Sequence, residues 1–361
     1  MAPSSSRVLS YDPQIFEHRG SLHVHAVFPH AWHLRSKSGQ ILSLVDSQWN
    51  GPLTMRIAGM PARHRVFPRM GATLTEAGLE VGAAVLSFAG ARPWTESVGG
   101  FEALNLAALR ADQEHIRGKV HAAARGGLAV GGAVGKSPTS HACRMAAPPG
   151  MKIGDGCLVN ISRREDREPS ATERRATPVM HMSRIGSRHF RRRGDATDAW
   201  LIRGEIEMAL LGEMLVQQDA VRVSRHATGL MGLGPGLTPS GDDVLCGLIA
   251  GLSVLGHRSV HQRERCDGAV AVLATCIARE APRRTTSLSA TLLQCAVRGV
   301  VAEPLLQVLG TVGSGNRLTG VDEVLMLGHS SGSDMLTGAL MACAVLVRWE
   351  ELFGPAMVGP R

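Results

Sequence analysis

The stretch GLGPGLTPSGDD, residues 232–243, leads directly into the apolar segment VLCGLIAGLSVL, residues 244–255. Glycine and proline indicate a tightly turned loop, and the apolar residues after it are dense enough for a buried helix. Ser240 is placed to cap that helix, and Asp242 and Asp243 fall in its first turn, where the helix dipole favours negative charge. A simple helix cap needs fewer glycines and prolines, so we interpret this stretch as a functional loop.

A second stretch, GHSSGSDMLTGAL at residues 328–340, repeats the end of the first one. Residues 240–247 match residues 331–338 at a constant offset of 91 (331 minus 240), and Ser, Gly, Asp, Leu and Gly recur in register. The repeat predicts a duplicated unit that directs two helix N-termini at one shared pocket. Gly247 and Gly338, the last matching pair, are expected where the helices pack closely.

Loops of this composition suit a small anion. Main-chain N–H groups at a helix N-terminus, with hydroxyl groups beside them, bind phosphate or carboxylate. The segment RRTTS, residues 283–287, adds guanidinium and hydroxyl groups at another expected helix start. We therefore predict that substrate or phosphate is bound by Gly234, Gly236, Thr238, Ser240, Gly241, Asp242, Arg284, Thr285, Thr286, Ser330, Ser331 and Gly332.

Three residues of the two stretches are candidates for catalysis. His329 stands where the first loop has Thr238, and a histidine in a Gly/Ser loop is suited to acid–base work or to donating a hydrogen bond to an oxyanion. A hydrogen bond that merely stabilises the loop is the alternative. Asp243 and Asp334, which match in the repeat, could orient hydroxyl groups, hold a divalent cation or cap their helices.

The remainder of the chain predicts an α+β protein. Short apolar runs between Gly, Pro and Asn turns over residues 20–95 indicate a β-rich domain, assigned to residues 15–110. Apolar residues at helical spacing indicate a helical domain over residues 196–352. Its helices are expected at residues 199–218, 242–256, 264–280, 286–299, 301–311 and 333–350.

Residues 111–195, between these domains, are rich in Gly, Pro and Arg and have little periodicity. Two interpretations stay open: a linker or insertion without regular structure, and a shifted reading frame in this part of the gene. Gly135-Lys136-Ser137 resembles the end of a phosphate-binding loop, but Val130 occupies a position where that motif needs glycine. The arginine cluster lacks interleaved aromatic residues, so a solvated linker is favoured over a nucleic-acid site.

The cysteines and the apolar segments indicate the cellular compartment. The seven cysteines include no CxxC pair and no zinc-site spacing, and their odd number indicates a reducing compartment. The N-terminal residues contain no apolar signal region, and the longest apolar runs are shorter than the roughly 20 residues that cross a bilayer. We expect a cytoplasmic protein without a membrane partner.

The motifs resemble those of a family long described as a domain of unknown function, which includes the AllH-type subunit of oxamate carbamoyltransferase in allantoin degradation. The resemblance rests on GLGPGLTPSGDD with the following GLIAGL, on LGHSSGSDMLTGAL, and more loosely on residues 24–57 with Phe28, Ala31 and Asn50-Gly51-Pro52. It implies phosphorolysis of oxalurate to oxamate and carbamoyl phosphate, together with two other subunits. No role for an individual side chain follows from the resemblance.

The resulting expectation is a subunit of a carbamoyltransferase-like complex that binds phosphate or carbamoyl phosphate and a small carboxylate, without a cofactor. Two alternatives stay open: a non-catalytic partner that completes the active site of another chain, and a magnesium-dependent phosphotransfer or hydrolytic enzyme using Asp242, Asp243 and Asp334. Whether the chain is itself an enzyme is left undecided. Nucleic acid is not an expected partner.

Overall fold

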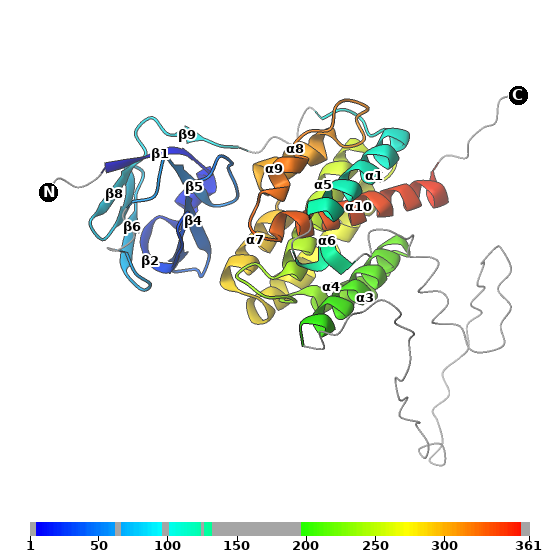
Figure 1. Ribbon diagram of the computed structural model, residues 1–361, viewed down its shortest axis with the longest axis horizontal. Helices are drawn as coiled ribbons and strands as arrows, with labels where there is room; N and C mark the ends of the chain where they lie inside the picture. The colour runs from blue at the N-terminus through cyan, green and yellow to red at the C-terminus, as the bar shows by residue number, and fades with distance from the viewer. Residues whose placement is uncertain (1–4, 62–65, 96–100, 124–125, 132–195, 355–361) are drawn as a thin grey trace, which may run out of the picture.

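A computed structural model describes residues 5–61, 66–95, 101–123, 126–131 and 196–354. It consists of an N-terminal β-barrel and a C-terminal helical bundle, which lie side by side (Figure 1). The predicted α+β class is thereby confirmed. The arginine cluster and the Gly135-Lys136-Ser137 sequence lie outside the described residues.

The barrel is a sheet closed by its first strand. Strand β1 pairs antiparallel with β5 and parallel with β8, which joins the two ends of the order β5-β4-β3-β2-β6-β7-β8. Closure leaves no long unpaired edge, and the alternating inward residues fill the interior. The strands are β1 Ser5–Tyr11, β2 Gly20–Val27, β3 Ala31–Ser36, β4 Ile41–Val45, β5 Thr54–Ile57, β6 Gly71–Leu74, β7 Gly78–Val81, β8 Ala84–Ser87 and β9 Arg92–Pro93.

The closing strand lies upstream of the β-rich domain expected at residues 15–110. Its short alternation gives a weak local signal, and pairing with strands distant in sequence determines its place. Inward residues such as Val8, Trp32 and Leu86 are completely buried. The 3-10 helix η1, Pro13–His18, follows β1 and places Ile15 in the same core.

The bundle surrounds one long buried helix, α5, which packs most extensively against α10. None of the helices in the described part of the chain is long and apolar enough to cross a membrane. The helices are α1 Leu106–Ala123, α3 Ala196–Val216, α4 Ala220–Leu230, α5 Ser240–Arg258, α6 Arg263–Arg284, α7 Ser287–Val297, α8 Glu303–Thr311, α9 Val321–Leu325 and α10 Ser331–Phe353, with the 3-10 helix η3 at Leu128–Gly131.

Helix α1 corrects part of the expectation for residues 111–195, because their first thirteen residues, 111–123, are helical. Leu109, Ile116 and Val120 are buried on one face of α1, and the charged residues of the helix occupy the other. Its many charged residues hid this periodicity in the sequence, and packing against α10 stabilises the buried face. Helices α4 and α9 were not predicted.

The barrel attaches to the bundle through α7 and α8. The main-chain N–H of Ile41 donates to Thr291 Oγ1 over 3.1 Å. Glu303 Oε2 accepts from the main-chain N–H and the side-chain amide of Asn50 over 3.0 and 2.8 Å. Both helices lie between α5 and α10 in sequence.

Candidate functional site

The predicted duplication is present in the structure as two helical hairpins. The first unit comprises α4, the first loop (residues 231–239) and α5; the second comprises α9, the second loop (residues 326–330) and α10. Each loop closes in the same way: Gly241 N–H donates to Leu233 O over 2.9 Å, and Gly332 N–H donates to Leu327 O over 3.0 Å. The two units are therefore alike in hydrogen bonding as well as in sequence.

Reciprocal glycines bring the long helices of the two units into backbone contact. A Cβ atom on Gly247 would overlap the carbonyl oxygen of Met335, and one on Gly338 would overlap that of Val244. The expectation that Gly247 and Gly338 mark close helix packing is confirmed. Because the contact lies within the first two turns of α5 and α10, the starts of both helices are held together.

The two loops meet through their hydroxyl groups. Thr238 Oγ1 of the first loop lies 2.9 Å from Ser331 Oγ at the start of α10. Both residues are partly exposed, whereas Ser240, the counterpart of Ser331, is buried. The structure thus brings together the two predicted loops and leaves the hydroxyls of Thr238 and Ser331 at the boundary between interior and surface.

Asp243 lies directly beneath this hydroxyl pair and is 1 % exposed. Burial, the largest effect, and the nearby carboxyls of Asp334 and Asp242 raise the pKa of Asp243 well above its ordinary value, against the lowering effect of hydrogen bonds from Ser331 and Thr238. Its Oδ2 atom is buried without a hydrogen-bond partner among the described residues.

Asp334, the counterpart of Asp243, is completely buried but differently held. The main-chain N–H of Ala129 donates to Asp334 Oδ1 over 3.1 Å, and Gly127 approaches so closely that a Cβ there would overlap the carboxylate. Burial raises the pKa of Asp334 to about 6, although hydrogen bonds from Ser240 and from the main chain of residues 128 and 129 oppose this rise. Asp334 therefore anchors η3 to α10.

Residues 127–129 were not among the predicted site residues. Gly126-Gly127 lay in the segment interpreted as irregular, and its contact with Asp334 spans more than 200 residues of sequence. The glycine pair before a short apolar run was the available signal. Gly127 has a φ of +73°, which glycine adopts without strain.

Asp242 is fully engaged in holding the first loop. Its Oδ1 accepts from the main-chain N–H of Gly232 over 2.9 Å, and its Oδ2 accepts from the Thr285 hydroxyl. Thr286 caps α7 by accepting from Ser289 N–H, and its own hydroxyl donates to Leu237 O. Asp242, Thr285 and Thr286 are thus close to the first loop, but these bonds use them to brace it.

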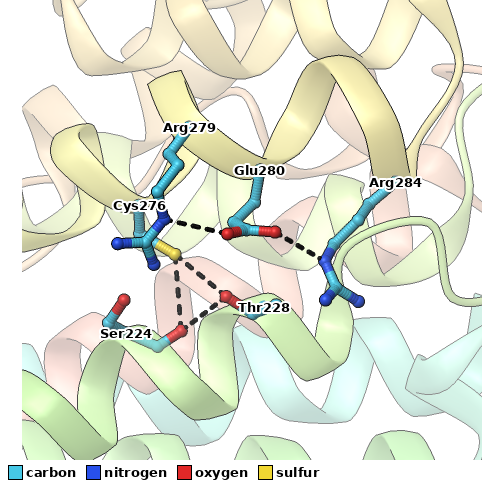
Figure 2. A network of polar contacts seen from close by, with 6 residues as sticks. All are labelled: Ser224, Thr228, Cys276, Arg279, Glu280 and Arg284. Carbon is cyan, nitrogen blue, oxygen red and sulfur yellow. Dashed lines mark hydrogen bonds and ion pairs between the residues drawn. The ribbon is translucent and has the colours of Figure 1, made fainter.

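Arg284 lies at the end of α6 and not at the helix start that the sequence suggested. Figure 2 shows Glu280 between two arginines: its carboxylate accepts from Arg284 Nε over 2.9 Å and from Arg279 Nε over 2.8 Å. Hydrogen bonds from Arg284 and Arg279 lower the pKa of Glu280. Because Arg284 is paired with Glu280, only part of its charge remains for an anion.

The helix starts also differ from the prediction. The residue that caps α5 is Pro239 rather than Ser240, and it makes no side-chain capping bond. The N–H groups of Gly241, Asp242 and Asp243 are already bonded, to Leu233 O and Pro239 O. Proline and glycine fold the first loop back onto the helix start, which satisfies donors that the sequence suggested were available to a ligand.

The remaining predicted residues lie on the outer side of the loops. Gly236 and His329 are exposed, Gly234 and Ser330 are partly exposed, and Gly234 and Gly236 have positive φ values of +110° and +103°. Within the described ranges, no three His, Cys, Asp or Glu side chains converge as a metal site requires. Chemically, the site combines surface hydroxyls, loop main chain and two buried carboxyls.

Comparison with known proteins bears on the same segment. The family model described as oxamate carbamoyltransferase subunit AllH matches residues 230–343, from the last residue of α4 into α10. This match contains both loops and both carboxyls. No solved structure matches the chain. The similarity predicted from the two motifs is confirmed, because residues 230–343 match the family of oxamate carbamoyltransferase subunit AllH.

Proposed function

We propose that this chain is a subunit of an oxamate carbamoyltransferase complex, in which the two loops bind carbamoyl phosphate or phosphate and a small carboxylate. The observation that carries the proposal is that one family match spans both loops, which meet at the 2.9 Å contact between Thr238 and Ser331. The other subunits of that complex are its partners.

The chemistry of carbamoyl transfer fits surface hydroxyls above buried carboxyls. When the carbamoyl group passes to phosphate, a phosphate oxygen bonds to the carbamoyl carbon and the bond from that carbon to the oxamate nitrogen breaks. Negative charge develops on the carbamoyl oxygen, and hydrogen-bond donors aimed at it lower the barrier. Thr238, Ser331 and the exposed main chain of Gly236 are the donors on offer, and the positive ends of α5 and α10 favour an anion nearby.

The exposure of the loops favours a site that another subunit completes. Pro235, Gly236, Leu237 and His329 are all exposed, and Leu237 has 37 % of its surface accessible. An active site must exclude water around the developing charge, and an exposed loop does so only when something covers it. This observation supports the second candidate function, in which the chain contributes loops to the active site of a partner chain.

The magnesium-dependent alternative has less support. Asp242 is one of the three proposed magnesium ligands, and both of its carboxylate oxygens accept hydrogen bonds, from Gly232 and Thr285. Asp334 is likewise bonded to the main chain of η3.

The test is carbamoyl transfer by the complex purified with its partner subunits. Thr238→Val keeps the shape of the side chain and removes its hydroxyl, and we expect it to lower transfer from carbamoyl phosphate to oxamate roughly 10- to 100-fold, the size of one hydrogen bond to a charged group. Thr275→Val is the matched control, since Thr275 is exposed on α6 and donates only to Ala271 O.

A complex that transfers no carbamoyl group under any condition would contradict the proposal. Transfer that Thr238→Val leaves equal to the Thr275→Val control would contradict the placement of the anion at the loops. Loss of assembly in Thr238→Val, with transfer restored at high subunit concentration, would support the second candidate function.

A further inference from the structure

The two units differ most at their buried carboxyls. Asp243 and Asp334 occupy equivalent positions in the repeat, and each has a buried Oδ2 without a hydrogen-bond partner among the described residues. Each carboxyl is contacted by two hydroxyls, those of Ser331 and Thr238 at Asp243 and those of Ser240 and Ser330 at Asp334. Asp334 in addition receives a main-chain N–H from Ala129. Main-chain donors give Asp334 a structural role. Asp243 is therefore the carboxyl of the pair that is available to exchange a proton.

The surroundings of Asp243 favour its uncharged form. Titratable groups that act on it are Asp334 on α10 and Asp242 and Cys246 on its own helix, and all of these are acids. No cationic side chain in the described part of the chain forms an ion pair with Asp243. A buried carboxylate without a cation costs several kcal/mol, and binding a proton removes that cost.

Hydroxyl groups connect this carboxyl to the loops. Ser331 contacts Asp243, and Ser331 Oγ lies 2.9 Å from Thr238 Oγ1, so two hydroxyls form a chain from a 1 % exposed acid to a partly exposed loop. Each hydroxyl can accept a proton on one side and donate its own on the other. Asp334 also has hydroxyl contacts, to the buried Ser240 and the partly exposed Ser330, but main-chain N–H groups of residues 128 and 129 hold its carboxyl as well.

We propose that Asp243 stores the proton of carbamoyl transfer and exchanges it with the substrate nitrogen through the Ser331 and Thr238 hydroxyls. This inference rests on the proposed function. In the direction of phosphorolysis, a phosphate oxygen bonds to the carbamoyl carbon, the carbon–nitrogen bond breaks, and the oxamate nitrogen keeps the electron pair. Thr238 gives that nitrogen its proton, Ser331 replaces the proton of Thr238, and Asp243 replaces that of Ser331 and becomes a carboxylate. Transfer to oxamate reverses each step.

The stored proton is tested first on the full chain alone, by infrared difference spectroscopy at pH 8, where Asp334, with a pKa of about 6, is ionised and adds little to the band. A protonated carboxyl group has a carbonyl stretch distinct from that of a carboxylate. We expect wild type to show this band, Asp243→Asn to lose it, and Asp242→Asn to keep it. Asp242 is the matched control because it is equally buried one residue earlier on the same helix. Absence of the band in wild type, or its survival in Asp243→Asn, would overturn the proposal.

The relay is tested on the complex. General acid–base groups contribute about 100- to 10,000-fold, so Asp243→Asn should lower turnover by that factor. Wild-type turnover should fall with rising pH in phosphorolysis and rise with pH in the reverse direction. Asp243→Asn should abolish both pH dependences, and Asp242→Asn should retain them. A Ser331→Thr variant, which retains the hydroxyl, should exceed Ser331→Ala in turnover.

These outcomes separate this inference from the proposed function. If Asp243→Asn transfers carbamoyl groups with the pH dependence of wild type, the proton relay is wrong and the proposed function is unaffected. If the complex transfers no carbamoyl group, the proposed function is wrong, and so is the proposed proton transfer to the substrate nitrogen. The infrared band decides independently whether Asp243 holds a proton.

Discussion

The first and second units share a sequence pattern, a loop closure and a helix contact, yet they differ in what holds each loop. The first loop is braced from outside its unit, because Thr285 donates to Asp242 and Thr286 donates to Leu237 O. The second unit has Ser333 where the first has Asp242, and the Ser333 hydroxyl donates to Ser330 O, within its own turn. The two units thus share a framework, and differences at single positions give their loops different support.

The largest expected effect comes from the feature that the units share most closely. Gly247→Ala and Gly338→Ala should each destabilise the fold by about 3 to 5 kcal/mol, because the new Cβ would overlap a carbonyl oxygen of the facing helix. Chemical denaturation measures both losses, and the comparison predicts that they are similar. Gly212→Ala on α3 is the control, since nothing lies within 4 Å of its Cβ, and it should stabilise the fold by roughly 0.5 to 1 kcal/mol.

A second prediction concerns pH and the buried carboxyl of the second unit. Burial raises the pKa of Asp334 from 3.8 to about 6, so the folded chain binds this proton more tightly than the unfolded chain does. The resulting stability is complete below about pH 4 and is lost as pH rises through about 6. The loss amounts to about 3 kcal/mol.

Unfolding free energies of wild type and Asp334→Asn at pH 4 and pH 8 check this prediction. The Asn variant does not ionise, so wild type should lose about 3 kcal/mol more than the variant over this range. Burial also raises the pKa of Asp243, but Asp243 is present in both proteins, so the difference between them reports on Asp334. Parallel pH curves for the two proteins would show that Asp334 ionises normally in the folded chain.

A third prediction breaks the asymmetry at η3. Gly127→Ala should cost about 2 kcal/mol, because the residue has a φ of +73° and its Cβ would overlap the Asp334 carboxylate. Gly315→Ala isolates the backbone part, since its φ is +81° and nothing lies within 4 Å of its Cβ. If the two variants lose equal unfolding free energy, the steric conflict between the new Cβ and Asp334 contributes nothing.

The smallest predicted effects compare the braces. Thr285→Val removes the external donor to Asp242 and leaves a buried carboxylate oxygen unsatisfied, at a cost of about 1 to 2 kcal/mol. Ser333→Ala removes one local bond to Ser330 O, for about 0.5 to 1 kcal/mol. Thermal unfolding of both variants should rank them in this order, and the reverse order would mean that the second loop depends more on its brace.

The sequence was sufficient where the signal was local or repeated. The long helices α5 and α10 follow from dense apolar runs, and the juxtaposition of Ser240 and Ser331 with Asp243 and Asp334 follows from the constant offset. Strand β1, which pairs with β5 and β8, was missed because distant partners determine a barrel strand. Polar or short helices such as α1 and α9 were missed because tertiary packing supplies most of their stability.

The hydrogen-bond partners of the site residues could not be predicted from the neighbouring sequence either. Whether a carboxyl oxygen accepts a main-chain N–H or a hydroxyl depends on segments far away in the chain, as with Ala129 and Asp334. Thr285 was predicted to bind substrate or phosphate, and in the structure its hydroxyl donates to Asp242. Composition indicated the groups present, and only the fold shows which of them are already in use.

In the proposed carbamoyltransferase complex, the backbone contact between α5 and α10 has a consequence for ligand exchange. Helices separated by large side chains can slide or hinge past one another as those side chains change rotamer, but a carbonyl seated against Gly247 or Gly338 leaves no layer to rearrange. Opening and closing must therefore come from the loops or from a neighbouring subunit. The rate at which product leaves should then follow the mobility of residues 231–239 and 326–330 and the lifetime of the assembled complex, with the paired helices acting as a fixed base.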